Sequence, residues 1–173
     1  MAAEASALQL RPLMAEDAAA FLALRLQALY AHPDVFGASA AEQAAMPLES
    51  LVQAITAEHQ YVLGAWQHAQ LVGSVALQRH TATKMVHIAD LWGMYVTSGQ
   101  RGQGVGNALL TALLAHARTM PGLRQVRLCV SSHNHRAIAL YTRHGFVRWG
   151  TAPQQLCVDG QYFDEDHMVC ILG

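Results

Sequence analysis

Residues 100–106 read Gln-Arg-Gly-Gln-Gly-Val-Gly, and no other part of the sequence says more about the structure. The stretch follows an apolar, strand-like run that ends at Val96 and precedes a helix-like run that begins at Asn107. Its glycines lack Cβ atoms, so backbone N–H groups can converge in one short turn and approach a ligand closely. The next helix directs the positive end of its dipole to the same point. The stretch therefore predicts a site for a phosphate or pyrophosphate group.

Two common nucleotide-binding turns do not fit this stretch. A P-loop requires Lys and then Ser or Thr directly after its last glycine, whereas Gly106 is followed by Asn107. A Rossmann turn requires a third glycine three residues after the second. That position holds Asn107 or Leu109, depending on the glycine pair from which the count begins. Taken alone, the stretch is also compatible with a flexible loop that joins two elements.

Two motifs occur in order, with one predicted helix and one predicted strand between them. Residues 101–106 have the pattern Arg-x-x-Gly-x-Gly, and residues 134–146 have the pattern Asn-x-x-Ala-x-x-Leu-Tyr-x-x-x-Gly-Phe. Both patterns resemble signatures of the GNAT superfamily of N-acetyltransferases, and the first resembles its acetyl-CoA signature. One departure is Ser98, where many relatives carry proline. The resemblance implies acetyl-CoA as co-substrate, bound by Met94, Val96, Arg101, Gly102, Gln103, Gly104, Val105, Gly106, Asn134 and Tyr141.

Hydrophobic periodicity predicts the elements around these motifs. A helix over 16–30 has Leu22, Leu26 and Leu29 on one face, and Pro47 starts another helix. Antiparallel strands come first and strand–helix crossovers follow, which implies a mixed α/β sheet with local parallel pairing. Strands are expected over 8–12, 61–66, 71–79, 86–96, 125–131, 146–150 and 162–172, and further helices after 106 and over 134–144.

The resemblance extends this order of elements to the GNAT fold over residues 8–173. It implies an α/β architecture with a mixed, mostly antiparallel sheet of about seven strands, flanked by about four helices. In that fold, the strand before the glycine turn and the strand after the next helix splay apart. The pantetheine arm of the cofactor enters the cleft between these two central strands.

Length and composition suit a single domain over residues 1–173. Apolar residues make up 53% of the sequence and charged residues 13%, which describes a globular protein rather than a disordered one. With a net charge of −1, the sequence lacks the excess of basic residues that is typical of nucleic-acid-binding proteins. No apolar run approaches the roughly 20 residues that span a bilayer, and the N-terminus, with Glu4, does not resemble a signal peptide. We therefore expect a cytoplasmic protein that binds neither nucleic acid nor a membrane.

The cysteines and histidines favour reduced thiols and no metal. Cys129, Cys157 and Cys170 are dispersed and odd in number, which fits free, buried thiols better than a disulfide framework. Local spacing pairs none of them with a general base, so a covalent cysteine mechanism is the less favoured alternative. His133 and His135 would point to opposite sides of an extended backbone, and no third ligand is evident nearby.

Acetyl transfer from a thioester to an amine defines the roles to be filled. An alkylammonium with a pKa of about 10.4 must lose a proton. The thioester carbonyl must be held and stabilised, and the departing thiolate must be protonated. By resemblance, Tyr141 holds the position whose phenol faces the CoA sulfur, which makes it the candidate general acid. The alternative for Tyr141 is an aromatic side chain packed into the core.

Asp90 is the candidate general base. It lies eleven residues before Arg101, where many relatives carry glutamate, and it is the only carboxylate over 86–96. Because an unpaired carboxylate is costly to bury, a charge in such an apolar run needs a reason. Aspartate is one methylene shorter than glutamate, so it would act through a water. The alternative is a solvated charge or a structural hydrogen-bond acceptor, and His87 is a candidate proton relay.

Residues 162–168, Tyr-Phe-Asp-Glu-Asp-His-Met, concentrate acidic residues in a predicted strand. Two interpretations are open: a solvated hairpin face, which we favour, and the lining of an acceptor pocket that attracts a cationic amine. The helical region over 36–57 is also expected to border the acceptor, although no pattern in it specifies one.

The sequence thus predicts an acetyl-CoA-dependent N-acetyltransferase that acts on a primary amine of a small molecule, amino acid or peptide. One alternative is a non-catalytic CoA-binding or regulatory module on the same fold. Another is an acyltransferase that uses a different acyl-CoA or a hydroxyl acceptor. The sequence does not identify the acceptor, and it does not distinguish a monomer from a homodimer.

Overall fold

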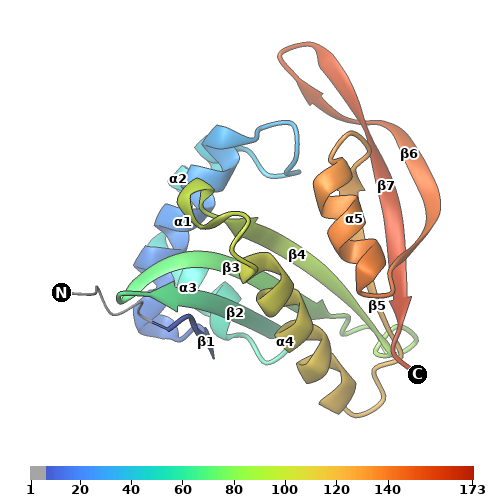
Figure 1. Ribbon diagram of the computed structural model, residues 1–173, viewed down its shortest axis with the longest axis horizontal. Coiled ribbons are helices and arrows are strands. Elements are labelled where there is room, and N and C mark those ends of the chain that lie inside the picture. Colours follow the sequence, from blue (N-terminus) through green and yellow to red (C-terminus); the bar gives the residue numbers. More distant parts are fainter. Residues whose placement is uncertain (1–6) are drawn as a thin grey trace.

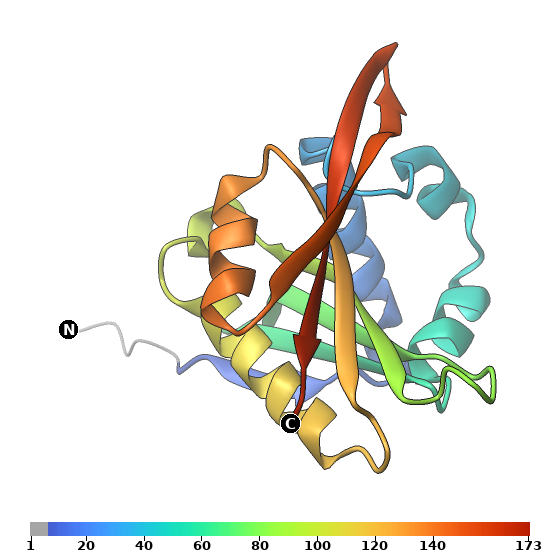
Figure 2. The same cartoon turned by 90° about the vertical axis from the view of Figure 1, so that its right-hand side faces the viewer.

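The computed structural model describes residues 7–173, so Glu4, used above to argue against a signal peptide, lies outside the described residues. One seven-stranded sheet, with the order β1-β2-β3-β4-β5-β7-β6, forms the frame of the molecule (Figures 1 and 2). The predicted mixed, mostly antiparallel sheet is therefore confirmed.

No helix in this part of the chain is long and apolar enough to cross a bilayer. The elements are β1 (Gln9–Pro12), α1 (Ala18–Ala31), α2 (Ala40–Ala45), α3 (Leu48–Thr56), β2 (Gln60–Gln67), β3 (Gln70–Arg79), β4 (Ile88–Val96), α4 (Val105–Thr119), β5 (Gln125–Ser131), α5 (His135–Arg143), β6 (Val147–Val158) and β7 (Gln161–Ile171).

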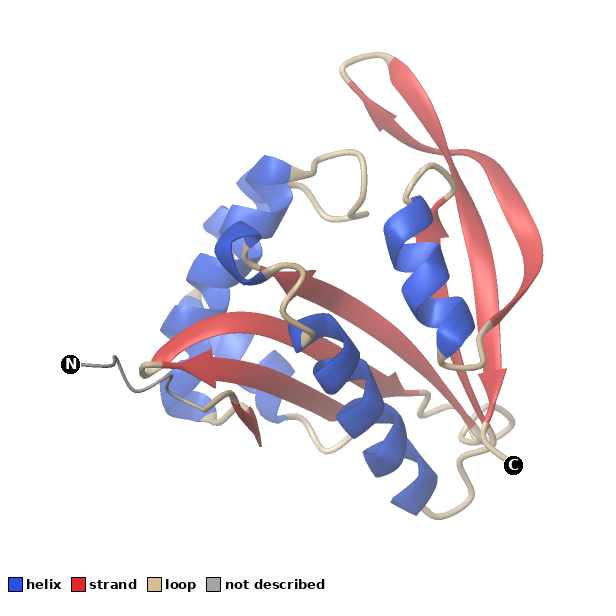
Figure 3. Cartoon of the chain, viewed as in Figure 1, coloured by secondary structure: helices blue, strands red, loops and turns tan. Residues whose placement is uncertain are grey.

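Strand β3 lies at the centre of the core. Every residue from Leu71 to Leu77 is buried, because α1 and α3 pack on one face of the sheet and α4 packs on the other (Figure 3). On α4, Leu109, Leu110 and Leu113 are completely enclosed. The helix expected after residue 106 is therefore present, and these leucines form the face by which it packs on the sheet.

Helix α1 presents a different face to the core from the predicted one. It buries Phe21 and Leu24, whereas Leu22 and Leu26 are only half-buried; Leu29 is buried as expected. The helix is apolar on nearly all sides, so periodicity alone could not select the face that packs on the sheet.

The two central strands diverge as expected. Strand β4 pairs in parallel with β5 only where Ile88–Asp90 lie beside Gln125–Arg127. Past these residues the strands separate, and α5 lies over the diverging part (Figure 1). A bulge at Gly93 and Met94 also interrupts the pairing of β4 with β3, and Gly93 has a φ angle of 64°. The splay and the bulge both release backbone groups of β4 from the sheet.

The short helix α2 was not predicted. Its N-terminus carries a capping box, in which Ser39 Oγ accepts the N–H of Glu42 at 3.1 Å and the Glu42 carboxylate accepts the N–H of Ser39 at 3.3 Å. The three-residue spacing of Ser39 and Glu42 is a sequence signature of a helix N-terminus. The six residues that follow Ser39 carry no apolar periodicity, which is why hydrophobic patterning does not detect the helix.

The C-terminal hairpin departs from the expected pairing. Strand β7 lies between β5 and β6, so the second crossover creates no neighbouring parallel pair, and the single parallel pair in the described sheet is β4–β5. Strand β6 continues to Val158 instead of ending at Gly150. As an exposed edge strand with a bulge at Pro153–Gln155, it lacks the apolar alternation that marks a half-buried strand. Asp159 and Gly160 form the turn between β6 and β7.

Candidate active site

The glycine turn lies at the N-terminus of α4. Gly102 and Gly104 have φ angles of 82° and 81°, in the left-handed region that favours glycine. A Cβ atom at either position would meet no heavy atom within 4 Å, so the backbone angle rather than crowding requires glycine. Helix α4 begins at Val105, two residues earlier than predicted, and its first N–H groups have no partners within the helix. The turn thus offers N–H donors and the positive helix end to an anion.

Two side chains predicted to contact the cofactor, Arg101 and Gln103, also hold the turn in place. Arg101 donates from Nε to the carbonyl of Val96 at 3.0 Å, and its Nη2 lies 2.9 Å from His32 Nε2. Gln103 donates from Nε2 to the carbonyl of Gly99 at 3.0 Å. These contacts tie the turn to β4 and to the end of α1, which leaves the backbone of the turn to bind a ligand.

A first cavity, of about 630 Å³, opens between the glycine turn, the end of β4 and α5. Asn134 lines it and caps α5, because its Oδ1 accepts the N–H of Ala137 at 3.2 Å. Of the other predicted cofactor residues, Gln103 does not line this cavity and Tyr141 lines its neighbour. Those that line it are Met94, Val96, Arg101, Gly102, Gly104, Val105 and Gly106.

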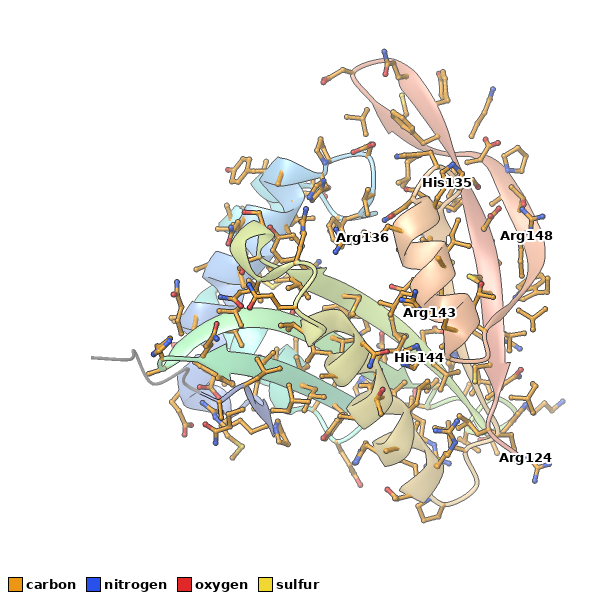
Figure 4. The ribbon with its side chains drawn as sticks, in the orientation of Figure 1. Arg124, His135, Arg136, Arg143, His144 and Arg148 are labelled. Carbon is orange, nitrogen blue, oxygen red and sulfur yellow. The ribbon has the colours of Figure 1, made fainter. Side chains whose placement is uncertain are left out.

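Two arginines of α5, missed from the sequence, also line the first cavity. Arg136 and Arg143 are seven residues apart, two helical turns, and both extend from the side of α5 that faces α4 and the glycine turn (Figure 4). Their spacing is the signal that could have identified them. Two cations beside a turn of free N–H groups are suited to hold more than one phosphate group.

A second cavity, of about 710 Å³, meets the first. Residues from β4 and α5, among them Met94, Ala137 and Leu140, line both cavities. The second cavity extends into the splay between β4 and β5, where charged and nucleophilic side chains gather. These are Arg25, His80, Asp90, Arg127, Cys129, Tyr141, Glu165 and His167.

Tyr141 fits both of its predicted interpretations. Its ring packs edge-to-face against Phe146, with centroids 5.7 Å apart, and only 6% of the residue is exposed. The same side chain lines the second cavity near the junction with the first. Burial raises the pKa of Tyr141 well above that of an ordinary phenol, because the phenolate would lose its hydration. The phenol therefore keeps its proton throughout the neutral and moderately alkaline range.

Asp90 has a histidine partner, His80, which was not singled out from the sequence. Its Oδ2 lies 2.8 Å from Nε2 of His80, at the last residue where β4 pairs with β5. Among the described residues, His87 lines neither cavity, and its carbonyl accepts the backbone N–H of Arg124. The Asp90 side chain is 47% exposed, so the carboxylate is hydrated and connected to solvent.

The acidic run of β7 is divided by strand alternation. Asp164 and Asp166 serve structure: Asp164 accepts the N–H of Gln154 at 2.7 Å, and Asp166 accepts hydroxyl protons from two neighbouring strand and loop residues. Glu165 and His167 point the other way and line the second cavity. Burial raises the pKa of Glu165. The favoured interpretation, a solvated hairpin face, is therefore wrong for these two residues.

Cys129 and His167 are brought together across β5 and β7. The Sγ of Cys129 lies 3.3 Å from His167 Nδ1, a pairing that local spacing could not reveal. Burial raises the pKa of the thiol, and the charges of Glu165 and Asp90 raise it further. A thiol held in its protonated form is a poor nucleophile, so this pair does not favour covalent catalysis.

His133 and His135, which flank Asn134, do not share a ligand. His133 Nε2 lies 2.8 Å from Asp34 Oδ2 and its ring tilts on Phe163, whereas His135 is exposed at the start of α5. No group of three or more His, Cys, Asp or Glu side chains within residues 7–173 is arranged to hold a metal ion.

Comparisons with known proteins agree on one family. The model of the acetyltransferase (GNAT) family matches residues 24–146. A mycothiol acetyltransferase of Salinispora tropica is 33% identical over 133 residues, which are 77% of this chain and 42% of that protein, so the chain spans less than half of that relative. An acetyltransferase of the GNAT family from Streptococcus pneumoniae has a TM-score of 0.86 at 23% identity, covering 96% of this chain and 100% of that one. Salmonella typhimurium yncA, solved with its cofactor acetyl-CoA, has a TM-score of 0.85 at 20% identity, covering 97% and 95%.

Proposed function

Because the chain belongs to the acetyltransferase (GNAT) family, we propose that it transfers an acetyl group from acetyl-CoA directly to a primary amine. The observation that carries this proposal is the junction of two cavities. The cavity beside the glycine turn meets, along α5, a second cavity that contains Tyr141, Asp90 and Glu165. A donor in the first cavity and an acceptor in the second would meet beside a proton donor and two carboxylates.

The residues of the first cavity fit acetyl-CoA. The left-handed glycines Gly102 and Gly104 present N–H groups to a pyrophosphate without a Cβ in the way. Arg136 and Arg143 supply positive charge for phosphate. Backbone groups of β4 near Met94, released by the bulge, are available to the pantetheine amides and the thioester carbonyl. Bound acetyl-CoA would supply the acetyl group as an activated thioester.

The second cavity provides the groups that handle protons. Asp90 accepts the proton of the ammonium, directly or through a water, and His80 passes it to solvent along the 2.8 Å contact. The more enclosed Glu165 attracts the ammonium into the cavity. Tyr141, whose raised pKa keeps the phenol protonated, donates to the sulfur as it leaves.

Two measurements test this function. Calorimetric titration of the folded protein with acetyl-CoA is expected to show binding, and no binding at millimolar cofactor would rule the function out. A thiol-release screen with amines, amino acids, polyamines and peptide N-termini is then expected to show turnover. Binding without turnover of any acceptor would instead indicate a non-catalytic CoA-binding module, and repeating the screen with longer acyl-CoA donors tests the acyl group.

A further inference from the structure

Arg25 is a buried cation without a carboxylate partner. It lies in the middle of α1 with 9% of its surface exposed, and its guanidinium packs against the rings of Trp92 and Phe36, at 5.4 and 6.0 Å. Within residues 7–173 the guanidinium makes no hydrogen bond and no ion pair. Burial lowers the pKa of Arg25, as expected where no neighbouring anion offsets the lost hydration of the charge.

Arg11 makes the same kind of ring contact as Arg25, and in addition it has a carboxylate partner. Its guanidinium also lies over a tryptophan, Trp66, at 4.3 Å, but it donates to both carboxylate oxygens of Asp17 at 2.6 and 2.8 Å. A buried charge without a partner destabilises the fold. The unpaired guanidinium of Arg25 therefore calls for an anion from outside the chain.

The donors of Arg25 are accessible from the second cavity. Arg25 lines that cavity together with Trp92 and Gly93. The one fully enclosed side-chain nitrogen or oxygen without a partner in the described part of the chain is Trp66 Nε1, so the guanidinium nitrogens are not sealed off. A Cβ atom on Gly93 would lie 3.5 Å from Nη1, which places the guanidinium directly beside the bulge of β4.

We propose that Arg25 binds an anionic group of the acceptor, so that the preferred acceptors are amines that also carry a carboxylate, phosphinate or phosphonate, as amino acids do. This inference rests on the proposed function. The planar guanidinium fork matches such groups with two parallel hydrogen bonds. Asp90 and Trp92 are two residues apart on β4, so their Cα atoms are about 7 Å apart. The cavity thus holds a cation, Arg25, beside Trp92, and a carboxylate, Asp90, two residues along the same strand. An acceptor that carries both an anionic group and an amine can contact the two at once.

Matched pairs of acceptors test this inference. Amino acids and their α-carboxamides differ by one charge at nearly constant shape, and glutamate with glutamine tests a side-chain carboxylate in the same way. Each acid is expected to exceed its amide in kcat/KM by about tenfold or more, the equivalent of one charge-assisted hydrogen bond. Arg25→Met should abolish this preference, Arg25→Lys should keep part of it, and the control Arg11→Met should leave it in place.

Thermal unfolding gives a second readout that needs no acceptor. Without ligand, Arg25→Met should raise Tm, because it removes an uncompensated buried charge. Arg11→Met should lower Tm, because it leaves Asp17 unpaired. A structural role for Arg25, through its ring contacts alone, predicts a lower Tm for Arg25→Met and would contradict the inference.

Other outcomes are equally decisive. The inference is overturned if no acid–amide pair is distinguished, either in turnover or in calorimetric binding to the CoA-loaded protein. It is also overturned if the preference survives Arg25→Met, or if it is lost only in Arg127→Met, which alters the other arginine of the cavity. Failure to bind acetyl-CoA would contradict the proposed function instead, because Arg25 lies outside the first cavity.

Discussion

Nε2 of His80 lies 2.8 Å from Oδ2 of Asp90, at the residue where β4 separates from β5. His80 follows the end of β3 and Asp90 lies near the start of β4, so the loop between these strands determines the contact. The pair connects the splayed strands to the surface, because both side chains are partly exposed. If Asp90 is the base, as proposed, the proton that it takes from an acceptor amine has a short route to water through His80.

Asp90→Asn should lower turnover at neutral pH by about 10²–10⁴-fold, the usual contribution of a general base. Activity should then recover by about tenfold for each pH unit as the free amine becomes available, up to its pKa of about 10.4. The measurement is the pH profile of kcat/KM. Wild-type rates across the whole profile would remove Asp90 from the mechanism.

Tyr141→Phe keeps the ring against Phe146 but removes the acidic proton. Turnover should fall by about 10²–10⁴-fold, and it should fall equally at all pH values below the raised pKa of the phenol. Stopped-time assays over the pH range, with Tm as the control for packing, distinguish this variant from Asp90→Asn. A loss rescued at high pH would contradict the role of Tyr141 as an acid.

Glu165→Gln tests the enclosed carboxylate through stability. Burial raises the folded-state pKa of Glu165 above the ordinary glutamate value of 4.5, so ionisation costs more in the folded chain than in the unfolded one. Wild type should therefore lose stability relative to Glu165→Gln as pH rises above 4.5. Thermal unfolding at a series of pH values should show equal Tm below that pH and a higher Tm for the variant at neutral pH. A pH-independent difference would contradict the assignment.

Gly104→Val in the glycine turn and Gly99→Val just before it form a matched pair. A Cβ at either position meets nothing within 4 Å, but only Gly104 has a positive φ angle, of 81°. Gly104→Val should cost about 1–2 kcal/mol in unfolding free energy, from backbone strain. It should also weaken acetyl-CoA binding by about tenfold or more, through lost hydrogen bonds to phosphate. Calorimetry should show near-normal binding for Gly99→Val, and equal losses in both variants would contradict the assignment.

Arg143→Gln should weaken acetyl-CoA binding and reduce its dependence on salt, because one phosphate contact is lost. Arg124→Gln is the control, since Arg124 lies at the other end of the molecule from the first cavity (Figure 4). Calorimetry at two ionic strengths makes the comparison. Equal salt dependence in wild type and Arg143→Gln would show that this arginine does not contact phosphate.

Local motifs identify the residues that line one half of the candidate site. The glycine turn at 101–106 and the cap at Asn134 act through backbone angles and contacts between near neighbours, which the spacing of residue types reveals. The histidine that pairs with Asp90 was not predicted, and His87, the candidate proton relay, does not take that place. His87 is three residues away, an odd offset that extended backbone places on the opposite face, whereas His80 reaches Asp90 across the β3–β4 connection.

The other half of the site depends on long-range pairing that no local pattern encodes. Cys129 and His167 are neighbours only because β7 lies beside β5. The same register brings Glu165 to the cavity, and a shift of one residue would have turned it to the opposite face. Arg25 lies in a helix so uniformly apolar that periodicity selected the wrong face.

Strand β7 has one more consequence, which concerns how this fold can diversify. The part of the chain that matches the family model ends at residue 146, and Glu165 and His167 lie beyond it, on the part of β7 that pairs with β5. The tip of the β6–β7 hairpin projects from the body of the molecule (Figure 2). Substitutions at these two positions would alter the wall of the second cavity without changing the glycine turn or β4. If that cavity takes the acceptor, as proposed above, acceptor choice can change through β7 while the residues proposed to hold acetyl-CoA stay the same.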